Sequence, residues 1–195
     1  TGPTDVDEGT LIVNGSIASS SLTTVAAPAT LGGSGAAGVT SVSGTVAPGT
    51  SAGTLSTGSL TLLDASVLQF ELGPPGIVGG GVNDLIDVAG DLDVDDGTVS
   101  LDVTPLAGFG VGTYTLITFS GSIFGDETNF QVGSPPAGVA GYRLMVHSLT
   151  AGGGNVQLMA VPEPATVLLL VLGGLCLIVY GKWRRPGERE ALVPR

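Results

Sequence analysis

The sequence predicts an all-β fold, best explained by a parallel β-helix or a similar solenoid, followed by one C-terminal transmembrane α-helix. First, the 195 residues include 33 glycines and 12 prolines but few Lys, Glu, Gln or Arg residues to cover a helix surface. Second, short apolar runs are bounded by Gly, Pro or Ser, as strands are. Third, similar strand-turn units return after about twenty residues, the scale of a solenoid coil. A two-sheet β-sandwich is the alternative arrangement of the same strands.

The first part of the chain predicts short stacked strands. No charged residue lies between Glu8 and Asp64, and apolar runs alternate there with Gly, Ser and Thr. The runs begin at Thr10, Ser21, Gly38 and Gly53. Small residues suit the turns between them, because a side chain at a tight turn would obstruct the next coil.

A cleaner alternation marks the middle of the chain. In VLQFELG, Leu68, Phe70 and Leu72 share one face, while Val67, Gln69 and Glu71 share the other. The loop PPGIVGGG follows. From Asp84 to Val103, apolar residues alternate with aspartates, which predicts two strands with an acidic outer face.

Three more strands are expected at Tyr114–Phe119, Tyr142–His147 and Asn155–Ala160. The first is almost wholly apolar and should be the most buried. In the second, Tyr142, Leu144 and Val146 should face inward, leaving Arg143, Met145 and His147 outside. Because the aromatic residues gather here, we expect the best-packed core between Leu101 and Leu158.

The body is strongly acidic. Residues 1–160 contain 14 acidic residues and one basic residue, Arg143. Such a surface repels nucleic acid and anionic lipid, so we expect no nucleic-acid partner. The single cysteine, Cys176, lies in the C-terminal apolar run, so the body has no internal disulfide. The chain starts without Met or a leader segment, and we interpret it as a fragment or a mature form.

No cofactor is expected. Asp91, Asp93, Asp95 and Asp102 fit positions 1, 3, 5 and 12 of a calcium-binding EF-hand loop, but glycine falls at position 7 rather than 6 and the flanks resemble strands. We interpret these aspartates as a solvated surface that discourages aggregation. The alternative is a looser Ca²⁺ site at the same four residues, because a cation would relieve their mutual repulsion.

The C-terminal segment has the features of a membrane span. Residues 165–181 form a run of 17 uncharged residues rich in Leu and Val. As a helix it would reach about 25 Å, and its flanking residues extend it to the thickness of a hydrocarbon core. The basic residues Lys182, Arg184 and Arg185 predict that this end is cytoplasmic and that the body lies outside the cytoplasm.

The residues Val161, Pro162, Glu163 and Pro164, the Leu-rich span and the basic end together resemble the PEP-CTERM sorting signal of exported bacterial proteins. Both prolines stiffen the motif into an extended segment at the outer membrane surface. The resemblance covers residues 161 to about 185. It implies recognition by exosortase, a membrane protease-transpeptidase, with cleavage at or near Pro-Glu-Pro.

This resemblance sets the expected domains. Residues 1–160 form an exported β-rich passenger domain, and residues 161–185 form the sorting signal. Within the signal, 162–164 is the motif, 165–181 the helix and 182–185 the basic stop. Residues 186–195 form a short cytoplasmic tail.

The body also resembles autotransporter passenger-like proteins. The shared segments are Gly-Thr-Leu units, the stretch from Ala47 to Leu55, the Asp84 to Val88 segment and the Gly112 to Ile117 strand. That resemblance implies a β-solenoid passenger with a structural role.

The sequence therefore predicts a non-enzymatic surface or extracellular-matrix protein, first anchored in the inner membrane and then processed by exosortase. Exopolysaccharide or matrix is the expected partner. One alternative is a permanently anchored single-pass protein. The other is a surface carbohydrate-binding or polysaccharide-active β-helix.

Overall fold

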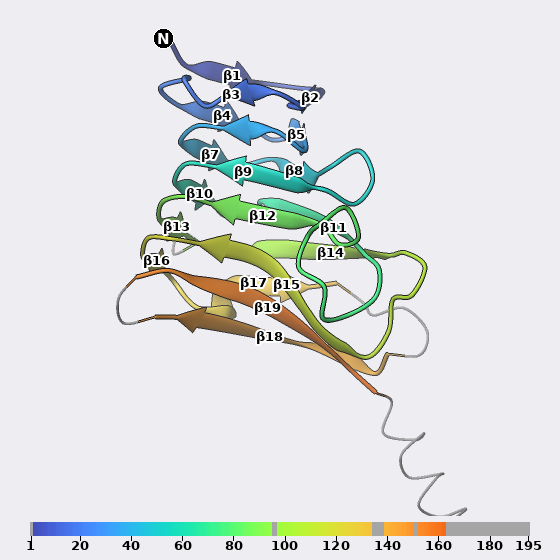
Figure 1. Cartoon of the computed structure of the whole chain (residues 1–195). Coiled ribbons are helices and arrows are strands. Elements are labelled where there is room, and N and C mark those ends of the chain that lie inside the picture. Colours follow the sequence, from blue (N-terminus) through green and yellow to red (C-terminus); the bar gives the residue numbers. More distant parts are fainter. Residues whose placement is uncertain (1, 95–96, 134–138, 150–151, 163–195) are drawn as a thin grey trace, which may run out of the picture.

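The chain winds through three sheets in a fixed order, and each turn adds one strand to each sheet (Figure 1). The computed structural model describes residues 2–94, 97–133, 139–149 and 152–162. Sheet A holds β1 (Thr4–Val6), β4 (Thr23–Val25), β7 (Thr40–Val42), β10 (Leu60–Leu62), β13 (Leu92–Asp93) and β16 (Ile123–Phe124). Sheet B holds β2 (Thr10–Ile12), β5 (Thr30–Gly33), β8 (Thr45–Pro48), β11 (Val67–Leu72), β14 (Val99–Pro105) and β17 (Phe130–Val132).

Sheet C differs from the other two at its C-terminal end. It holds β3 (Ser16–Ile17), β6 (Ala36–Ala37), β9 (Thr54–Thr57), β12 (Leu85–Val88) and β15 (Gly112–Phe119) in parallel order. An antiparallel hairpin, β18 (Gly141–Ser148) and β19 (Gly154–Val161), then pairs with β15 through β19. One 3₁₀ turn, η1 (Glu127–Asn129), precedes β17. This three-sided parallel arrangement confirms the all-β solenoid rather than the sandwich.

The coils lengthen along the chain. In sheet A, Thr4 lies opposite Thr23 and Thr23 opposite Thr40, so the first coils contain 19 and 17 residues. Further on, Leu60 lies opposite Leu92, a step of 32 residues. The expected repeat of about twenty residues therefore holds for the early coils and fails for the later ones.

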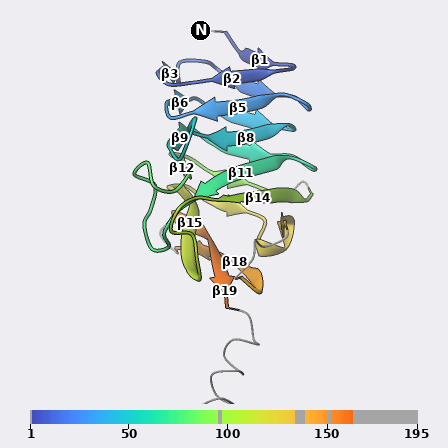
Figure 2. The ribbon, with the colours of Figure 1, turned by 90° about the vertical axis from the view of Figure 1, so that its right-hand side faces the viewer.

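In the coil from β10 to β13, most of the added residues lie at one corner, between sheet B and sheet C. Two residues, 34–35, separate β5 from β6, whereas twelve residues, 73–84, separate β11 from β12. The longer connection contains the PPGIVGGG segment and projects beside the stacked strands (Figures 1 and 2). We call residues 73–84 the corner loop.

Close stacking explains one glycine of the early coils. Gly33 has a φ of +101°, and a Cβ atom there would collide with the backbone of Val13 in the preceding coil. Only glycine meets both demands without strain. Gly33 therefore allows its coil to stack closely on the preceding one.

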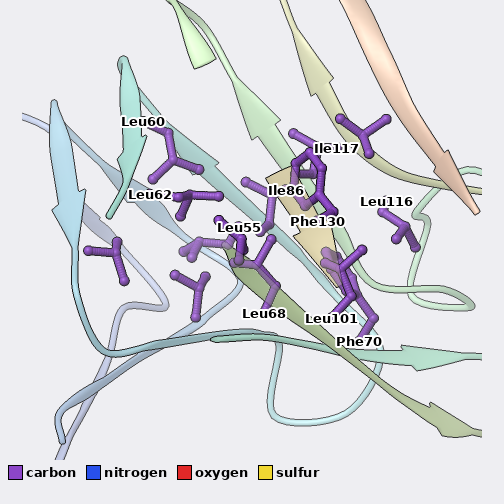
Figure 3. Close-up of a cluster of buried hydrophobic side chains, with 14 of the residues drawn as sticks. Leu55, Leu60, Leu62, Leu68, Phe70, Ile86, Leu101, Leu116, Ile117 and Phe130 are labelled. Carbon is purple, nitrogen blue, oxygen red and sulfur yellow. The ribbon is translucent and has the colours of Figure 1, made fainter. Parts of the chain in front are cut away.

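One continuous core runs through the centre of the coils (Figure 3). Alternation along β11 directs Leu68, Phe70 and Leu72 inward and leaves Gln69 exposed, as predicted. Figure 3 shows Leu68 and Phe70 among leucines and isoleucines of the neighbouring coils. Such burial contributes roughly 1.5–3 kcal/mol per large apolar side chain.

The strand β15 departs from strict alternation. Its register against β19 shifts between Thr115 and Ile117, so Leu116 and Ile117 are both fully buried. A bulge of this kind turns consecutive side chains toward the same side. We expected Tyr114–Phe119 to be the most buried strand; four of its six residues are buried, and Thr115 and Thr118 are half-buried.

The hairpin covers the C-terminal end of the core. Tyr142, Leu144 and Val146 pack against it, while Arg143 and His147 are exposed, as expected. The expected strand at Asn155–Ala160 is β19, which begins one residue earlier at Gly154, where it pairs with Ser148 of β18. Met145, predicted to lie outside, is half-buried.

The stretch from Asp84 to Val103 forms three strands, not the two that were predicted. Because β12, β13 and β14 lie on sheets C, A and B, this stretch wraps around the body once. Its outward aspartates are therefore distributed over three sides, and the single acidic outer face that was predicted is wrong. Alternation identifies the inward residues but does not show where the chain turns a corner.

Candidate functional site

The last described strand leads directly into the expected sorting motif. Ala160 is buried, and the carbonyl of Val161 accepts a hydrogen bond of 2.9 Å from the Ala140 N–H. Pro162 is the first residue beyond β19, and it is exposed. Val161 thus belongs to the folded body, and Pro162 is the first residue after the strand.

The rest of the predicted signal lies outside the described residues. This applies to Glu163 and Pro164, to the expected helix at 165–181, to the basic residues Lys182, Arg184 and Arg185, and to the expected tail at 186–195. In the part of the chain that is described, no helix has the length and apolar character needed to cross a membrane.

The structure separates the aspartates that were considered for Ca²⁺. Asp91 precedes β13 on sheet A, and its Oδ1 accepts a hydrogen bond of 2.7 Å from the Ser122 N–H. Asp93 lies in β13, whereas Asp102 lies in β14 of sheet B. Asp95 is outside the described residues. Within residues 2–94, 97–133, 139–149 and 152–162, no three His, Cys, Asp or Glu side chains gather in a way that could hold a metal ion.

A polar groove lies on the outer side of sheet B, a side that Figure 2 presents to the viewer. Its volume is about 380 Å³, and three successive coils contribute to it. Ala47, Pro48 and Gly49 supply small residues from the β8 coil. The polar lining residues are Thr50, Ser51, Gln69, Glu71, Asp84, Asp102 and Thr104. We call this the sheet B groove.

The corner loop is held beside this groove by a buried asparagine that the sequence analysis did not single out. The Oδ1 atom of Asn83 accepts a hydrogen bond of 2.6 Å from the Gly73 N–H. Its Nδ2 atom donates to the carbonyls of Pro74 and Ile77, at 3.0 and 2.7 Å. One side chain therefore satisfies three backbone groups of the loop, which fixes its path.

Asp84 joins the corner loop to two neighbouring segments. Its Oδ1 accepts from the Gly53 N–H at 2.7 Å, and its Oδ2 accepts from the Glu71 N–H at 2.6 Å. Asp84 is 1% exposed, and both of its carboxylate oxygens accept hydrogen bonds within the fold. An Asn-Asp pair directly after a glycine-rich loop and before an apolar strand was the sequence signal for this arrangement.

Burial makes the Asp84 carboxyl group a weaker acid than an ordinary aspartate. Loss of hydration raises the pKa of Asp84 from 3.8 to about 6, and the nearby charge of Glu71 acts in the same direction. The two backbone hydrogen bonds oppose this rise, because they favour the ionised form. Asp84 consequently stabilises the groove wall and changes its charge in mildly acidic solution.

Comparison with known proteins identifies the C-terminal segment. Residues 160–185 match the PEP-CTERM protein-sorting motif. The match begins within β19, at buried Ala160, so the signal follows the folded body without a spacer. The predicted resemblance is confirmed, and a signal of this kind marks an exported protein.

The chain is also similar to a short part of an autotransporter adhesin. It is 41% identical over 117 residues to the Adhesin BmaC autotransporter of Brucella suis biovar 1 (strain 1330). The matched segment covers 57% of this chain but 3% of that much longer protein. The chain therefore carries a PEP-CTERM protein-sorting motif behind a β-helical body, and 57% of it is similar to a short part of an autotransporter adhesin.

Proposed function

We propose that this protein is an exported β-helix that exosortase processes at the PEP-CTERM motif for delivery to the cell surface or extracellular matrix. Its role there is structural or adhesive rather than enzymatic. The observation that carries the proposal is the junction at Val161 and Pro162, where the last described strand ends and the matched signal continues. Cleavage at or near Pro162–Pro164 would leave β1 to β19 intact.

The similarity to an adhesin supports the adhesive role. The described body consists of stacked β-helical coils, which present long ladders of side chains to a partner. The acidic body also suits an extracellular position, since its charge disfavours nucleic acid and anionic lipid.

Before processing, residues 165–181 would anchor the protein in the inner membrane. Tyr180 and Trp183 would lie at the membrane surface, and Lys182, Arg184 and Arg185 would hold that end in the cytoplasm. Exopolysaccharide or matrix remains the proposed partner of the released body.

Tracking the two ends of the chain tests the processing step. An epitope placed after Arg185 should be lost from the mature body in cells that possess exosortase and retained in cells that lack it. A variant with Pro162, Glu163 and Pro164 all changed to Ala should retain the epitope in both. Retention of the epitope by the unaltered chain in exosortase-containing cells would favour the alternative of a permanent single-pass anchor.

The single cysteine tests the anchor. In membranes from cells lacking exosortase, Cys176 should resist a water-soluble maleimide and should react after SDS is added. The matched control is a Cys176→Ser, Ser148→Cys variant, because Ser148 is exposed on β18 and its replacement should react without SDS. Rapid labelling of Cys176 in intact membranes would contradict the proposed span.

A further inference from the structure

The sheet B groove contains polar side chains with no partner of their own. No hydrogen bond joins the side chains of Gln69, Glu71, Asp102 or Thr104 to another group in the part of the chain that the structure describes. Gln69, Asp102 and Thr104 are exposed, and Glu71 is half-buried. The groove therefore presents unused amide, hydroxyl and carboxylate groups to a ligand.

Strand pairing places these groups at regular positions. In the β11–β14 register, Gln69 lies opposite Asp102 and Glu71 lies opposite Thr104. Neighbouring strands are about 4.8 Å apart, and alternate residues along one strand are about 6.6 Å apart. The four side chains thus form a small rectangular array on a rigid sheet, which presents them at fixed spacings.

The surrounding residues leave this array accessible. Ala47 and Gly49 provide little side-chain bulk on the β8 side, and Thr50 and Ser51 add two exposed hydroxyl groups. Phe70 lines the groove from below, but it is 1% exposed and offers no aromatic surface for stacking. Recognition must therefore depend on hydrogen bonds and charge.

The charge of the groove is uncompensated. Arg143 is the only basic residue among residues 1–160, and it lies on β18 of sheet C. No described salt bridge neutralises Glu71 or Asp102, whereas Asp84 is already bonded to the Gly53 and Glu71 backbone. The groove consequently favours a cationic ligand and disfavours carboxylated, sulfated or phosphorylated ones.

We propose that the sheet B groove binds a saccharide that carries free amino groups, an inference that rests on the proposed adhesive role and specifies its ligand. Ammonium groups pair with Glu71 and Asp102, and sugar hydroxyls bond to Gln69, Thr104 and the Thr50–Ser51 turn. A groove of about 380 Å³ falls within the range of small-ligand sites. Because the contacts are solvent-exposed and no ring stacks on the sugar, the affinity of one groove is weak, in the millimolar range.

A pair of ligands with one difference tests the charge requirement. The purified full-length chain in mild detergent is titrated with a glucosamine tetramer and with its fully N-acetylated counterpart, in mildly acidic buffer. Isothermal calorimetry or ligand-observed NMR should show at least about tenfold tighter binding of the free amine. Equal affinities would overturn the proposed role of the amino group, and no binding of either would overturn the site.

Matched variants test the location. Glu71→Gln with Asp102→Asn should weaken binding of the glucosamine tetramer by about tenfold, since each exposed ion pair contributes up to about fivefold. Asp5→Asn with Asp7→Asn removes the same charge from the first coil and should change affinity less than about twofold. Circular dichroism melting curves of all variants verify that each is folded.

If the two charge-removing double variants lost affinity for the tetramer equally, binding would reflect general electrostatic attraction. That result would overturn the sheet B groove as the binding site. Gln69→Ala with Thr104→Ala provides a further test without a change of charge, and unchanged binding would exclude hydrogen bonding by this array. The outcome is separate from that of the epitope experiment. If the chain is processed but does not bind the tetramer, only the proposed saccharide site is refuted. If it binds the tetramer but is not processed, only the proposed exosortase processing is refuted.

Discussion

The buried carboxylate of Asp84 should make the protein more stable as the solution becomes mildly acidic. Burial raises the pKa of Asp84 from 3.8 to about 6, so the folded chain holds this proton more tightly than the unfolded chain. The stability contributed by this group is fully present below pH 3.8 and is lost as the pH rises through about 6. An ordinary salt-bridged aspartate has the opposite dependence.

The size of the effect follows from the pKa. A rise from 3.8 to about 6 corresponds to about 3 kcal/mol between the two protonation states. Integrated over the window from about pH 7 to about pH 5, it increases the free energy of unfolding by about 1.3 kcal/mol. Other titrating groups also contribute, so the informative quantity is the difference between the unaltered chain and Asp84→Asn, which cannot titrate at this position.

Two measurements check this prediction. Urea unfolding, followed by circular dichroism, should give a stability difference between the two proteins that changes by about 1.3 kcal/mol from about pH 7 to about pH 5. A ¹³C NMR titration of the Asp84 carboxyl carbon should show a midpoint near 6. Parallel unfolding curves across this window, or a midpoint near 4, would refute the effect of burial.

Five further substitutions, arranged in three tests, probe the fold. Tyr114→Phe should cost about 1–2 kcal/mol in urea unfolding, because its hydroxyl bonds to backbone groups at 2.8 and 2.9 Å. Tyr142→Phe should cost less than about 0.5 kcal/mol, since its buried hydroxyl has no partner among the described residues; equal costs would contradict this. Gly33→Ala should lower the melting temperature more than Gly9→Ala, which has open space around it, and the reverse order would exclude the stacking clash. Asn83→Ala should expose the corner loop to limited proteolysis, and an unchanged cleavage pattern would show that its three hydrogen bonds are dispensable.

Much of the fold was predictable because each strand obeys a local rule. The alternation in β11 identified Leu68, Phe70 and Leu72 as core residues, and the structure buries all three. The glycine- and serine-bounded runs similarly predicted short strands and a solenoid repeat. These patterns depend on neighbouring residues only, so one sequence is enough to recognise them.

The positions of the corners were not predictable in the same way. Asp93 and Asp102 continue one alternating pattern, yet the chain turns from sheet A to sheet B between them. The sheet B groove was missed for a related reason, since Gln69 and Asp102 are brought together only by the pairing of β11 with β14. Such contacts depend on coil length, which varies along this chain.

The corner loop indicates that this β-helix tolerates insertions between sheet B and sheet C. Between β5 and β6 the same corner needs two residues, and between β11 and β12 it holds twelve without interrupting either sheet. Gly80 and Gly81 are exposed in this loop, and the side chain of Asn83 bonds to neither of them. A foreign peptide inserted between these two glycines should be displayed on the outside of the rod, which makes this corner a natural position for sequence diversification and for engineered display.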